Sequence, residues 1–338
     1  MTAVTVVGCG AVGGTLALHL TLAGAEVTVV ERDTAHRDAI AARGITVTGA
    51  DGTATTVRPA AVVDPADPLT GVRCTTVLLA VKSQDTLAAA GWVAPRLTAD
   101  GHLVSCQNGG NTDVLAGVVG PDRVLGAFVD IAADVVGPGT VRSGGVTRLV
   151  VGEPGGGPGH RAAALAALLP EVVQTTDDVR GLIWSKRVLA AMYTLTALVD
   201  ADTADVIDRH RDLMLAVAAE VRAIAAAEGV TLRDLGYFDP ARLADDPGGC
   251  LDDLVAWQRG VTKVRVGPFR DIAVRGRRTE AHTELADLRR AAAAHGLPAH
   301  HLARLDGQLT ELESDRRSFT HDNLRPAEWP APIGQEIA

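Results

Sequence analysis

The stretch "VTVVGCGAVGG", residues 4–14, decides the fold of the first half of this chain. A short β-branched run is followed by Gly8, Gly10 and Gly13, and then by an apolar segment of helical length. This order predicts a strand, a GxGxxG turn and a helix, the first part of a dinucleotide-binding βαβ unit. In such a turn Gly8 makes the tight bend, Gly10 lets the backbone approach a pyrophosphate, and Gly13 lets the helix pack closely on the strand.

The residues on either side of this turn extend the same prediction. Ala11 and Val12 open the helix, whose N-terminal amides and dipole suit a phosphate. The segment "EVTVVE", residues 26–31, ends in Glu31, at the place where a carboxylate hydrogen-bonds the ribose 2′-hydroxyl of NAD. Arg32 follows directly and could instead bind the 2′-phosphate of NADP. We therefore expect NAD and keep NADP as the alternative.

The pattern of residue types along the chain changes near residue 177. Before it, β-branched runs alternate with helix-sized segments, which predicts βαβ units and a parallel sheet with covered faces. After it, long alanine- and leucine-rich segments with helical periodicity dominate. We expect an α/β domain with a doubly wound parallel Rossmann sheet over residues 1–177, an all-helical substrate and dimerisation domain over 178–325, and an irregular tail over 326–338.

Composition excludes several classes of protein. The chain has 338 residues, 47% of them hydrophobic, and a formal net charge of −9, which argues against nucleic-acid binding. Its four cysteines lie far apart without a CxxC pair, and no metal-ligand spacing of His or Cys occurs. The uncharged N-terminal stretch is interrupted by glycines and has no basic region before it, unlike a signal peptide or a membrane span. We expect a cytoplasmic protein without a metal, a nucleic-acid partner or a membrane partner.

Lysine is scarce in this chain. Lysine and arginine together number 32, but only Lys82, Lys186 and Lys263 are lysines. A desolvated lysine can donate a proton near neutral pH, whereas an arginine cannot. Lys186 stands in "WSKRVLAAMYT", on a predicted helix, and is therefore a candidate proton donor. The alternative is an ordinary amphipathic side chain whose charge reaches solvent.

Two further candidates follow predicted strands. Lys82 follows the run "TTVLLAV", and Asn108 ends "HLVSCQN". Both stand where the carboxyl ends of parallel strands meet, which is the ligand-binding edge of an open α/β sheet. The alternatives are a strand-end charge facing water for Lys82 and a turn residue before a glycine pair for Asn108.

The order of the motifs resembles that of one known family. "GCGAVG", "VK", "NGG", "PGTVRSGG", "WSK" and "RDIAVRGRRTE" follow one another as in the ketopantoate reductases, over nearly the whole chain. "ERDTAHRDAI" and "FRDIAVRGRRTE" look closer to the branch with NAD-dependent D-2-hydroxyacid dehydrogenases of the D-mandelate type. The resemblance implies a Rossmann domain, a helical C-terminal domain, a cleft between them, and hydride transfer from NAD(P)H to the carbonyl of a 2-oxo acid.

The resemblance also implies roles for single residues. Lys186 corresponds to the family's catalytic lysine, and Glu280 to its acidic site residue near the C-terminus. Lys82 and Asn108 correspond to positions on the cofactor and substrate side. For Glu280 the alternative is an ordinary carboxylate in the first turn of a helix.

The chain departs from the family where the substrate is held. The family places asparagines one and two helical turns after the catalytic lysine, where this chain has Ala190 and Thr194. A substrate-binding serine of the family falls at or near Gly267. A site that loses hydrogen-bond donors loses discrimination for the substrate that needed them. We therefore predict that ketopantoate is a poor substrate and that a bulkier or more apolar oxo or imino compound is reduced.

Two other functions stay open at this stage. The chain could reduce a C=N bond, as imine- or opine-type reductases do. It could also be a catalytically inactive NAD(P)-binding sensor, since the expected asparagines are absent. The apolar helical domain could support a homodimer.

Overall fold

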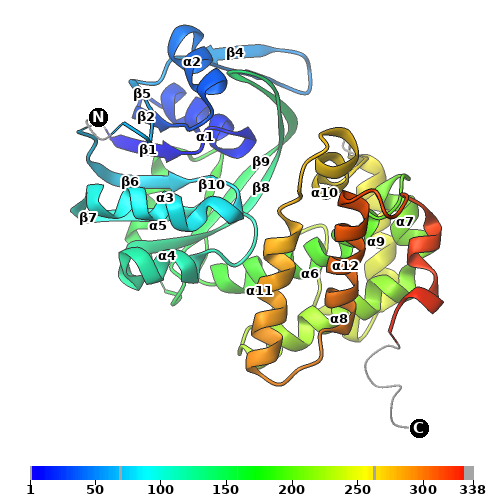
Figure 1. Ribbon diagram of the computed structural model, residues 1–338. Helices are drawn as coiled ribbons and strands as arrows, with labels where there is room; N and C mark the ends of the chain where they lie inside the picture. Colours follow the sequence, from blue (N-terminus) through cyan, green and yellow to red (C-terminus); the bar gives the residue numbers. More distant parts are fainter. Residues whose placement is uncertain (1, 68–70, 158, 262–263, 331–338) are drawn as a thin grey trace. The chain divides into compact units, whose positions relative to one another are not determined.

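The computed structural model of this protein describes residues 2–67, 71–157, 159–261 and 264–330 (Figure 1). The chain divides into two compact units, residues 1–180 and residues 181–338. Lys263 lies outside the described residues. In the part of the chain that is described, no helix is both long and apolar enough to cross a membrane.

Strands and helices alternate in the first unit. Its main elements are β1 (Ala3–Val7), α1 (Ala11–Leu22), β2 (Glu26–Val30), α2 (Thr34–Arg43), β3 (Ile45–Thr48), β4 (Ala54–Val57), β5 (Ala61–Val63), β6 (Cys74–Leu79), α3 (Thr86–Val93), β7 (Leu97–Ser105), α4 (Thr112–Val119), β8 (Val124–Gly137), β9 (Thr140–Gly152), α5 (His160–Leu168) and β10 (Val173–Thr175). A 3₁₀ turn, η1 (Ser83–Asp85), leads from β6 into α3.

Six of these strands form the parallel sheet that the sequence predicts. Their order is β5-β2-β1-β6-β7-β8, and every neighbouring pair is parallel. Numbered along the chain as 1 to 6, the strands run 3-2-1-4-5-6, the order of a doubly wound dinucleotide-binding sheet. The predicted Rossmann fold is therefore confirmed.

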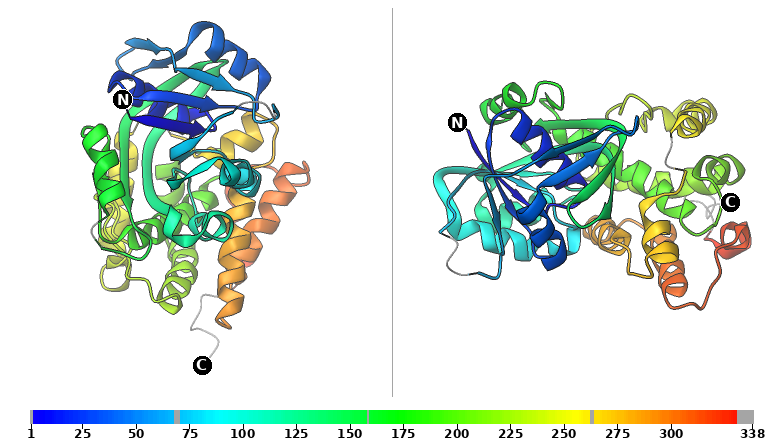
Figure 2. Two further views of the ribbon diagram at one scale, coloured as in Figure 1. Left: turned by 90° about the vertical axis from the view of Figure 1, so that its left-hand side faces the viewer. Right: turned by 90° about the horizontal axis from the view of Figure 1, so that it is seen from above.

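The sheet continues beyond this parallel part, which the sequence analysis did not anticipate. β8 and β9 form a long antiparallel pair (Figure 2), β3 runs parallel to β9, and β4 runs antiparallel to β3. The turn between β8 and β9 contains Gly139 with a φ of +73°, a conformation that glycine adopts without strain. The sheet is therefore mostly parallel, with an antiparallel extension; the glycines of "PGTVRSGG" interrupt the residue pattern in the first part of β9 and leave this pairing without a local signal.

Side chains of the central strands serve two cores. Val6 and Leu78 belong to a cluster with Leu16 of α1, whereas the next residues, Val7 and Leu79, belong to a cluster with side chains of α3 and α4. Successive residues of a strand point to opposite faces, so a sheet covered on both faces needs unbroken apolar strands. This requirement explains why the strands carry β-branched runs without polar alternation.

The second unit is helical, as the sequence predicts. Its helices are α6 (Val179–Thr196), which begins two residues before the division, α7 (Thr203–Arg209), α8 (Arg211–Ala227), α9 (Pro247–Gly260), α10 (Gly267–Phe269), α11 (Ala281–Ala294) and α12 (His300–Glu313). α11 and α12 lie side by side, and both contact α8 (Figure 1). The fully buried Glu220 of α8 accepts the amides of His301 (2.8 Å) and Leu302 (3.0 Å) at the start of α12.

The segment after α12 packs on this helical unit as far as it is described. Pro326–Glu328 form a 3₁₀ turn, and the indole of the buried Trp329 donates to the carbonyl oxygen of Asn323 at 2.8 Å. Of the tail expected over 326–338, residues 331–338 lie outside the described residues.

Candidate active site

The three glycines of the turn between β1 and α1 are needed for different reasons. At Gly8, φ is +85° and an added Cβ would lie 2.7 Å from a Val81 methyl; at Gly13 it would lie 1.9 Å from the carbonyl oxygen of Gly8. At Gly10, apart from its chain neighbours, an added Cβ would meet no atom of the described residues within 4 Å. Protein packing therefore requires glycine at the first and third positions, and leaves open space at the second.

That open space lies at the start of α1. Gly10 is the N-cap of this helix, no side chain caps it, and its first turn carries no acidic residue. Ala11 and Val12, the next two residues, are partly exposed. An uncapped N-terminus with free space beside it has the amide donors and the positive dipole end that a phosphate needs. The residues present therefore fit the pyrophosphate of a dinucleotide.

A histidine that the sequence analysis did not single out holds this turn in place. His36 of α2 is buried, and its Nδ1 accepts the amide of Gly139 at 3.1 Å. Its Nε2 must then carry the proton, and it donates to the carbonyl oxygen of Cys9 at 2.9 Å. One imidazole thus joins the glycine turn to the turn between β8 and β9.

Glu31 and Arg32 lie beside the glycine turn with different partners. The Glu31 carboxylate accepts the amides of Cys9 (2.8 Å) and Asp33 (2.9 Å), so it is fixed against the backbone at the end of β2. Arg32 is exposed and forms a two-pronged ion pair with Asp85, Nη1 to Oδ1 at 2.7 Å and Nη2 to Oδ2 at 2.8 Å. Asp85 was not among the residues that the sequence singled out.

Lys82 and Asn108 are exposed residues of two neighbouring loops. Lys82 is the N-cap of η1 after β6, and Asn108 follows β7, which is parallel to β6. The Asn108 carbonyl oxygen accepts the Asn111 side-chain amide at 2.7 Å, and Asn111 also donates to Ser83 Oγ at 3.1 Å. The structure therefore brings these two loops together, as the strand order predicts.

The buried side-chain amides of Gln107 and Asn111 connect the loops that follow β6 and β7. Gln107 Nε2 donates to the carbonyl oxygen of Val81 (3.0 Å) and to Thr86 Oγ1 (2.8 Å), and Thr86 Oγ1 donates to Asn111 Oδ1 (3.0 Å). Buried amides with satisfied hydrogen bonds fix a loop in one conformation. Sequence reasoning missed Gln107 and Asn111, although their place beside Asn108 and the scarcity of asparagine were available signals.

In the second unit, the neighbours of Lys186 are engaged in packing. Trp184 and Arg187 are buried, with the guanidinium 4.3 Å from the ring centroid of Trp184. Ser185 Oγ accepts the amide of Arg233 at 2.7 Å. Arg187 also forms ion pairs with Glu284 (2.6 Å) and Asp287 of α11. Lys186 itself is partly exposed and interacts with a partner of its own. The contacts of its neighbours fix the helix on which it stands.

The positions one and two turns after Lys186 offer few donors. Ala190 is partly exposed and has no polar side chain. Thr194 is buried, and its hydroxyl donates to the carbonyl oxygen of Ala190 at 2.7 Å. A threonine that bonds back to its own helix has already used its one proton.

Gly267 and Glu280 lie at the start of two helices. Gly267 is partly exposed at the start of α10, and an added Cβ there would meet no atom of the described residues within 4 Å, apart from its chain neighbours. Glu280 is the N-cap residue of α11, is partly exposed and has a partner of its own. Because Arg187 ties α6 to α11 one turn further on, at Glu284, the elements that carry Lys186 and Glu280 are held together within this unit.

A buried histidine supports the Glu280 segment. His282 Nδ1 lies 2.6 Å from Asp306 Oδ1, and its Nε2 lies 3.1 Å from Glu313 Oε2, in an ion pair without hydrogen-bond geometry. Glu313 also accepts the amide of Thr279 at 2.8 Å. The hydrogen bond to Asp306 raises the pKa of His282, against burial, and Glu313 adds to this rise; the same hydrogen bond lowers the pKa of Asp306.

These shifts predict a pH-dependent contribution to stability. A raised histidine pKa stabilises the fold fully below the unfolded value of about 6.5, and this stabilisation disappears as pH rises through the folded value. The lowered Asp306 pKa adds stabilisation that is lost only as pH falls below about 4. We expect His282→Gln to lower the free energy of unfolding by about 1–3 kcal/mol at pH 5.5, and by less at pH 8.5.

Urea unfolding at the two pH values measures this difference. His295→Gln is the control, because His295 forms a comparable pair with Glu228 (2.9 Å) that is more exposed. Equal losses for His282→Gln at both pH values would show that the charge of this histidine does not stabilise the fold.

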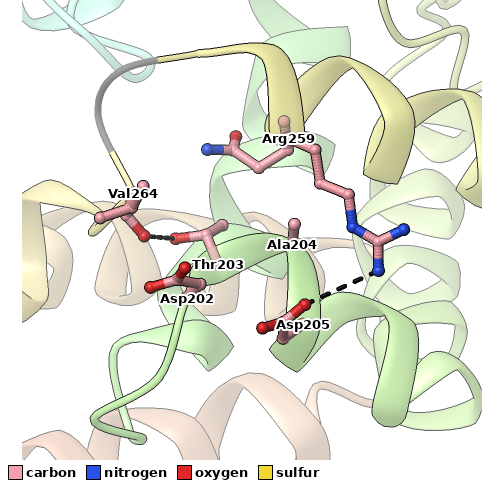
Figure 3. A pocket seen from close by; sticks show the side chains of 7 residues that line it. Asp202, Thr203, Ala204, Asp205, Arg259 and Val264 are labelled. Atoms are coloured by element: carbon pink, nitrogen blue, oxygen red, sulfur yellow. Dashed lines mark hydrogen bonds and ion pairs between the residues drawn. The ribbon is translucent and has the colours of Figure 1, made fainter.

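One pocket of the second unit contains none of the expected site residues. Asp202, Thr203, Ala204, Asp205, Gln258, Arg259 and Val264 line it (Figure 3). Thr203 donates to the carbonyl oxygen of Val264 at 3.0 Å, and Arg259 lies 3.6 Å from Asp205. Its polar side chains are also engaged by residues outside the pocket: Arg265 pairs with Asp202, and the Tyr193 hydroxyl donates to Gln258 Oε1 at 2.9 Å. Among the described residues, no group of three or more His, Cys, Asp or Glu side chains could hold a metal ion.

Comparison with known proteins identifies the family. Residues 4–156 match the sequence model of ketopantoate reductase PanE/ApbA, and residues 178–313 match that of its C-terminal part. The chain belongs to the ketopantoate reductase family. Members of this family are NAD(P)-dependent oxidoreductases that act on a keto group, so the chain is an oxidoreductase of this type.

Individual relatives agree with this assignment. A 2-dehydropantoate 2-reductase of Mesorhizobium japonicum is 30% identical over 209 residues, which are 54% of this chain and 62% of that protein. The crystal structure of a PanE/ApbA family ketopantoate reductase from Ralstonia eutropha JMP134 is 29% identical, with a TM-score of 0.78 over 93% of this chain and 99% of that chain.

A D-mandelate dehydrogenase also shares the fold. Its ternary structure with NADH and anilino(oxo)acetate has a TM-score of 0.80 over 93% of this chain and 99% of that chain, at 18% identity. At this identity the likeness concerns the fold alone. A place of this ketopantoate reductase family member in the D-mandelate branch stays a prediction.

Proposed function

We propose that this chain reduces the carbonyl of a 2-oxo acid other than ketopantoate with NADH, and that Lys186 donates the proton. The observation that carries the reductase proposal is the open space at Gly10, next to the uncapped start of α1. Packing explains Gly8 and Gly13 but not Gly10, whereas a pyrophosphate at the helix N-terminus explains the glycine at position 10.

Glu31 supports NAD rather than NADP. Two backbone amides hold its carboxylate at the end of β2. A fixed carboxylate at this position can accept a hydrogen bond from the ribose 2′-hydroxyl and repels a 2′-phosphate. Lys82 and Asn108, whose loops are joined by Asn111, are proposed to contact the cofactor, and Asn108 also the substrate.

The proposed chemistry needs a proton donor. When bound, the reduced nicotinamide supplies the hydride. Negative charge then develops on the carbonyl oxygen, and a positioned acid that protonates it contributes roughly 10²–10⁴ in rate. Lys186 Nζ is proposed as this donor because lysine, unlike arginine, can release its proton to a reacting group. Glu280, at the start of the helix that Arg187 ties to α6, is proposed as the acidic residue of the same site.

The substrate proposal rests on the helix face after Lys186. Ala190 has no donor, and the Thr194 hydroxyl is taken by the Ala190 carbonyl oxygen. Gly267 adds no side chain either. A substrate that makes fewer polar contacts than ketopantoate fits these positions best.

Restoring the missing donors should restore activity on ketopantoate. Ala190→Asn combined with Gly267→Ser should raise kcat/KM for ketopantoate by about tenfold or more, since each side chain adds hydrogen-bonding groups. Among the described residues, no atom other than those of the chain neighbours lies within 4 Å of the Gly267 Cβ position, which leaves room for the serine. Steady-state kinetics would measure the gain. Ala293→Asn, at an exposed position of α11, is the control, and an equal gain there would contradict the proposal.

A screen of 2-oxo acids of graded size tests the function itself. Oxidation of NADH and of NADPH is followed in parallel, with and without ammonia or a primary amine. Turnover that requires the amine indicates a C=N reductase, and cofactor binding without any turnover indicates a sensor. Reduction of ketopantoate with a kcat/KM of about 10⁴ M⁻¹s⁻¹ or more would overturn the substrate proposal.

Two expectations from the sequence concern the chain as a whole. All four cysteines are buried free thiols, in agreement with the reducing cytoplasm proposed for this protein. The homodimer stays a prediction, which sedimentation analysis of the purified chain would test.

A further inference from the structure

One ion pair joins the end of β2 to the turn after β6. Arg32 uses both terminal nitrogens of its guanidinium to contact both carboxylate oxygens of Asp85, at 2.7 and 2.8 Å. The Arg32 side chain is 70% exposed, but that of Asp85 is only 22% exposed. Asp85 is therefore the more buried partner of this pair, and the exposed Arg32 side chain extends to it.

Asp85 has a fixed position for local reasons. It ends the 3₁₀ turn η1 and is the N-cap residue of α3. Its amide donates to the carbonyl oxygen of Lys82 at 2.8 Å. The hydroxyl of Thr86, the next residue, is buried and hydrogen-bonded to the side chains of Gln107 and Asn111. The carboxylate therefore stands on a rigid support.

Arg32 is the residue that would otherwise bind a 2′-phosphate. It follows Glu31, whose carboxylate stands at the ribose end of the proposed cofactor site. A guanidinium binds a phosphate through two parallel N–H donors. In this chain both terminal nitrogens of Arg32 donate to the Asp85 carboxylate instead. The nearby Arg37 is also paired, with Asp64 at 3.1 Å.

We propose that Asp85 sets the cofactor preference of this chain by holding Arg32 in an ion pair, so that the guanidinium is not available to a 2′-phosphate. Asp85 acts in two ways: it occupies the donors of Arg32, and its negative charge repels a second anion at the same place. Asp85 is thus a specificity-determining residue and not a catalytic one. This inference rests on the proposed binding of a dinucleotide at the glycine turn.

Asp85→Asn in the full chain tests the inference. Dissociation constants for NADH and NADPH are measured by fluorescence titration, which needs no substrate. NADPH should bind about tenfold more tightly than to the unchanged chain, because the freed guanidinium gains a charge-assisted phosphate contact. NADH should change by less than about threefold. Arg32→Ala in the Asp85→Asn background should remove the gain.

Arg32→Ala gives a second test. If Asp85 holds Arg32, NADPH binding should weaken in this variant only by the repulsion of the Asp85 carboxylate that has lost its partner, and the Arg32→Ala, Asp85→Asn double variant should bind NADPH within about threefold of the unchanged chain. A loss of about tenfold or more in the double variant would show that Arg32 already binds the 2′-phosphate, and would overturn the inference. An exposed ion pair contributes little to stability, so both variants should fold.

Asp130→Asn is the matched control. Asp130 pairs with Arg148 at 3.1 Å in the β8–β9 extension, with side-chain exposures of 19% and 34%. This substitution should leave the ratio of the two dissociation constants unchanged. If the unchanged chain binds NADH but Asp85→Asn leaves the ratio as it was, this inference alone is overturned. If the unchanged chain binds neither dinucleotide, the proposed function is overturned together with it.

Discussion

Replacing Lys186 with alanine should lower kcat at least 100-fold, equivalent to about 2.7 kcal/mol in the activation barrier. The reason is that the variant lacks the side chain proposed to protonate the carbonyl oxygen. The dissociation constant for NADH should stay within about threefold, because Lys186 belongs to the second unit and the proposed cofactor residues to the first. Steady-state kinetics with the 2-oxo acid found in the screen, together with a cofactor titration, would measure both quantities.

Lys186→Arg separates proton donation from charge. An arginine keeps the positive charge but does not release its proton, so kcat should fall nearly as far as with alanine. Thermal unfolding is the control: Lys186 is only partly buried, while its neighbours Trp184 and Arg187 carry the packing, so both variants should unfold near the temperature of the unchanged chain. Turnover of the alanine variant at the original rate would contradict the proton-donor role of Lys186. Full activity of the arginine variant would show that the positive charge at this position is sufficient and that proton donation is not needed.

Alanine at Gly13 should lower stability, whereas alanine at Gly10 should lower cofactor affinity. At Gly13 the new Cβ would lie 1.9 Å from the carbonyl oxygen of Gly8, so the turn must open, and we expect a loss of about 3 kcal/mol in unfolding free energy. At Gly10 the Cβ meets no atom of the described residues within 4 Å apart from its chain neighbours, and the backbone φ of −68° suits alanine, so stability should change by less than about 1 kcal/mol. Urea unfolding measures both.

Cofactor binding then completes this comparison. The Gly10→Ala variant should fold normally but bind NADH about tenfold more weakly or worse, because the methyl group takes the space proposed for the pyrophosphate. Normal NADH affinity in this variant would contradict the phosphate site at the start of α1. Normal stability of the Gly13→Ala variant would contradict the close packing of the turn.

Much of the first unit could be predicted from local sequence. The run "VTVVGCGAVGG" forms β1, the turn and α1 because its apolar period and glycine spacing act over a few residues. The placement of Lys82 and Asn108 on adjacent loops followed from the rule that parallel strands end at one edge. The antiparallel pairing of β8 with β9 did not follow, because glycines interrupt the pattern on which strand prediction depends.

The second unit shows the same division. The helices of "WSKRVLAAMYT" and of the segment after Glu280 were predictable from periodicity, and they are present as α6 and α11. That Arg187 joins these two helices through Glu284, and that the Thr194 hydroxyl bonds to its own helix, are properties of the packed side chains. The catalytic roles of Lys186 and Glu280 stay predictions.

The sequence by itself determined the order of elements, the glycine turn and the family, because each depends on contacts between residues close along the chain or on motifs in a set order. Only the tertiary structure decided which distant groups meet. His36 reaches Gly139 across 103 positions, and Arg32 reaches Asp85 across 53. Such contacts depend on how the strands are ordered in the sheet, which no local pattern encodes. The arginine that sequence reasoning left open to either cofactor is, in the folded chain, held by an aspartate.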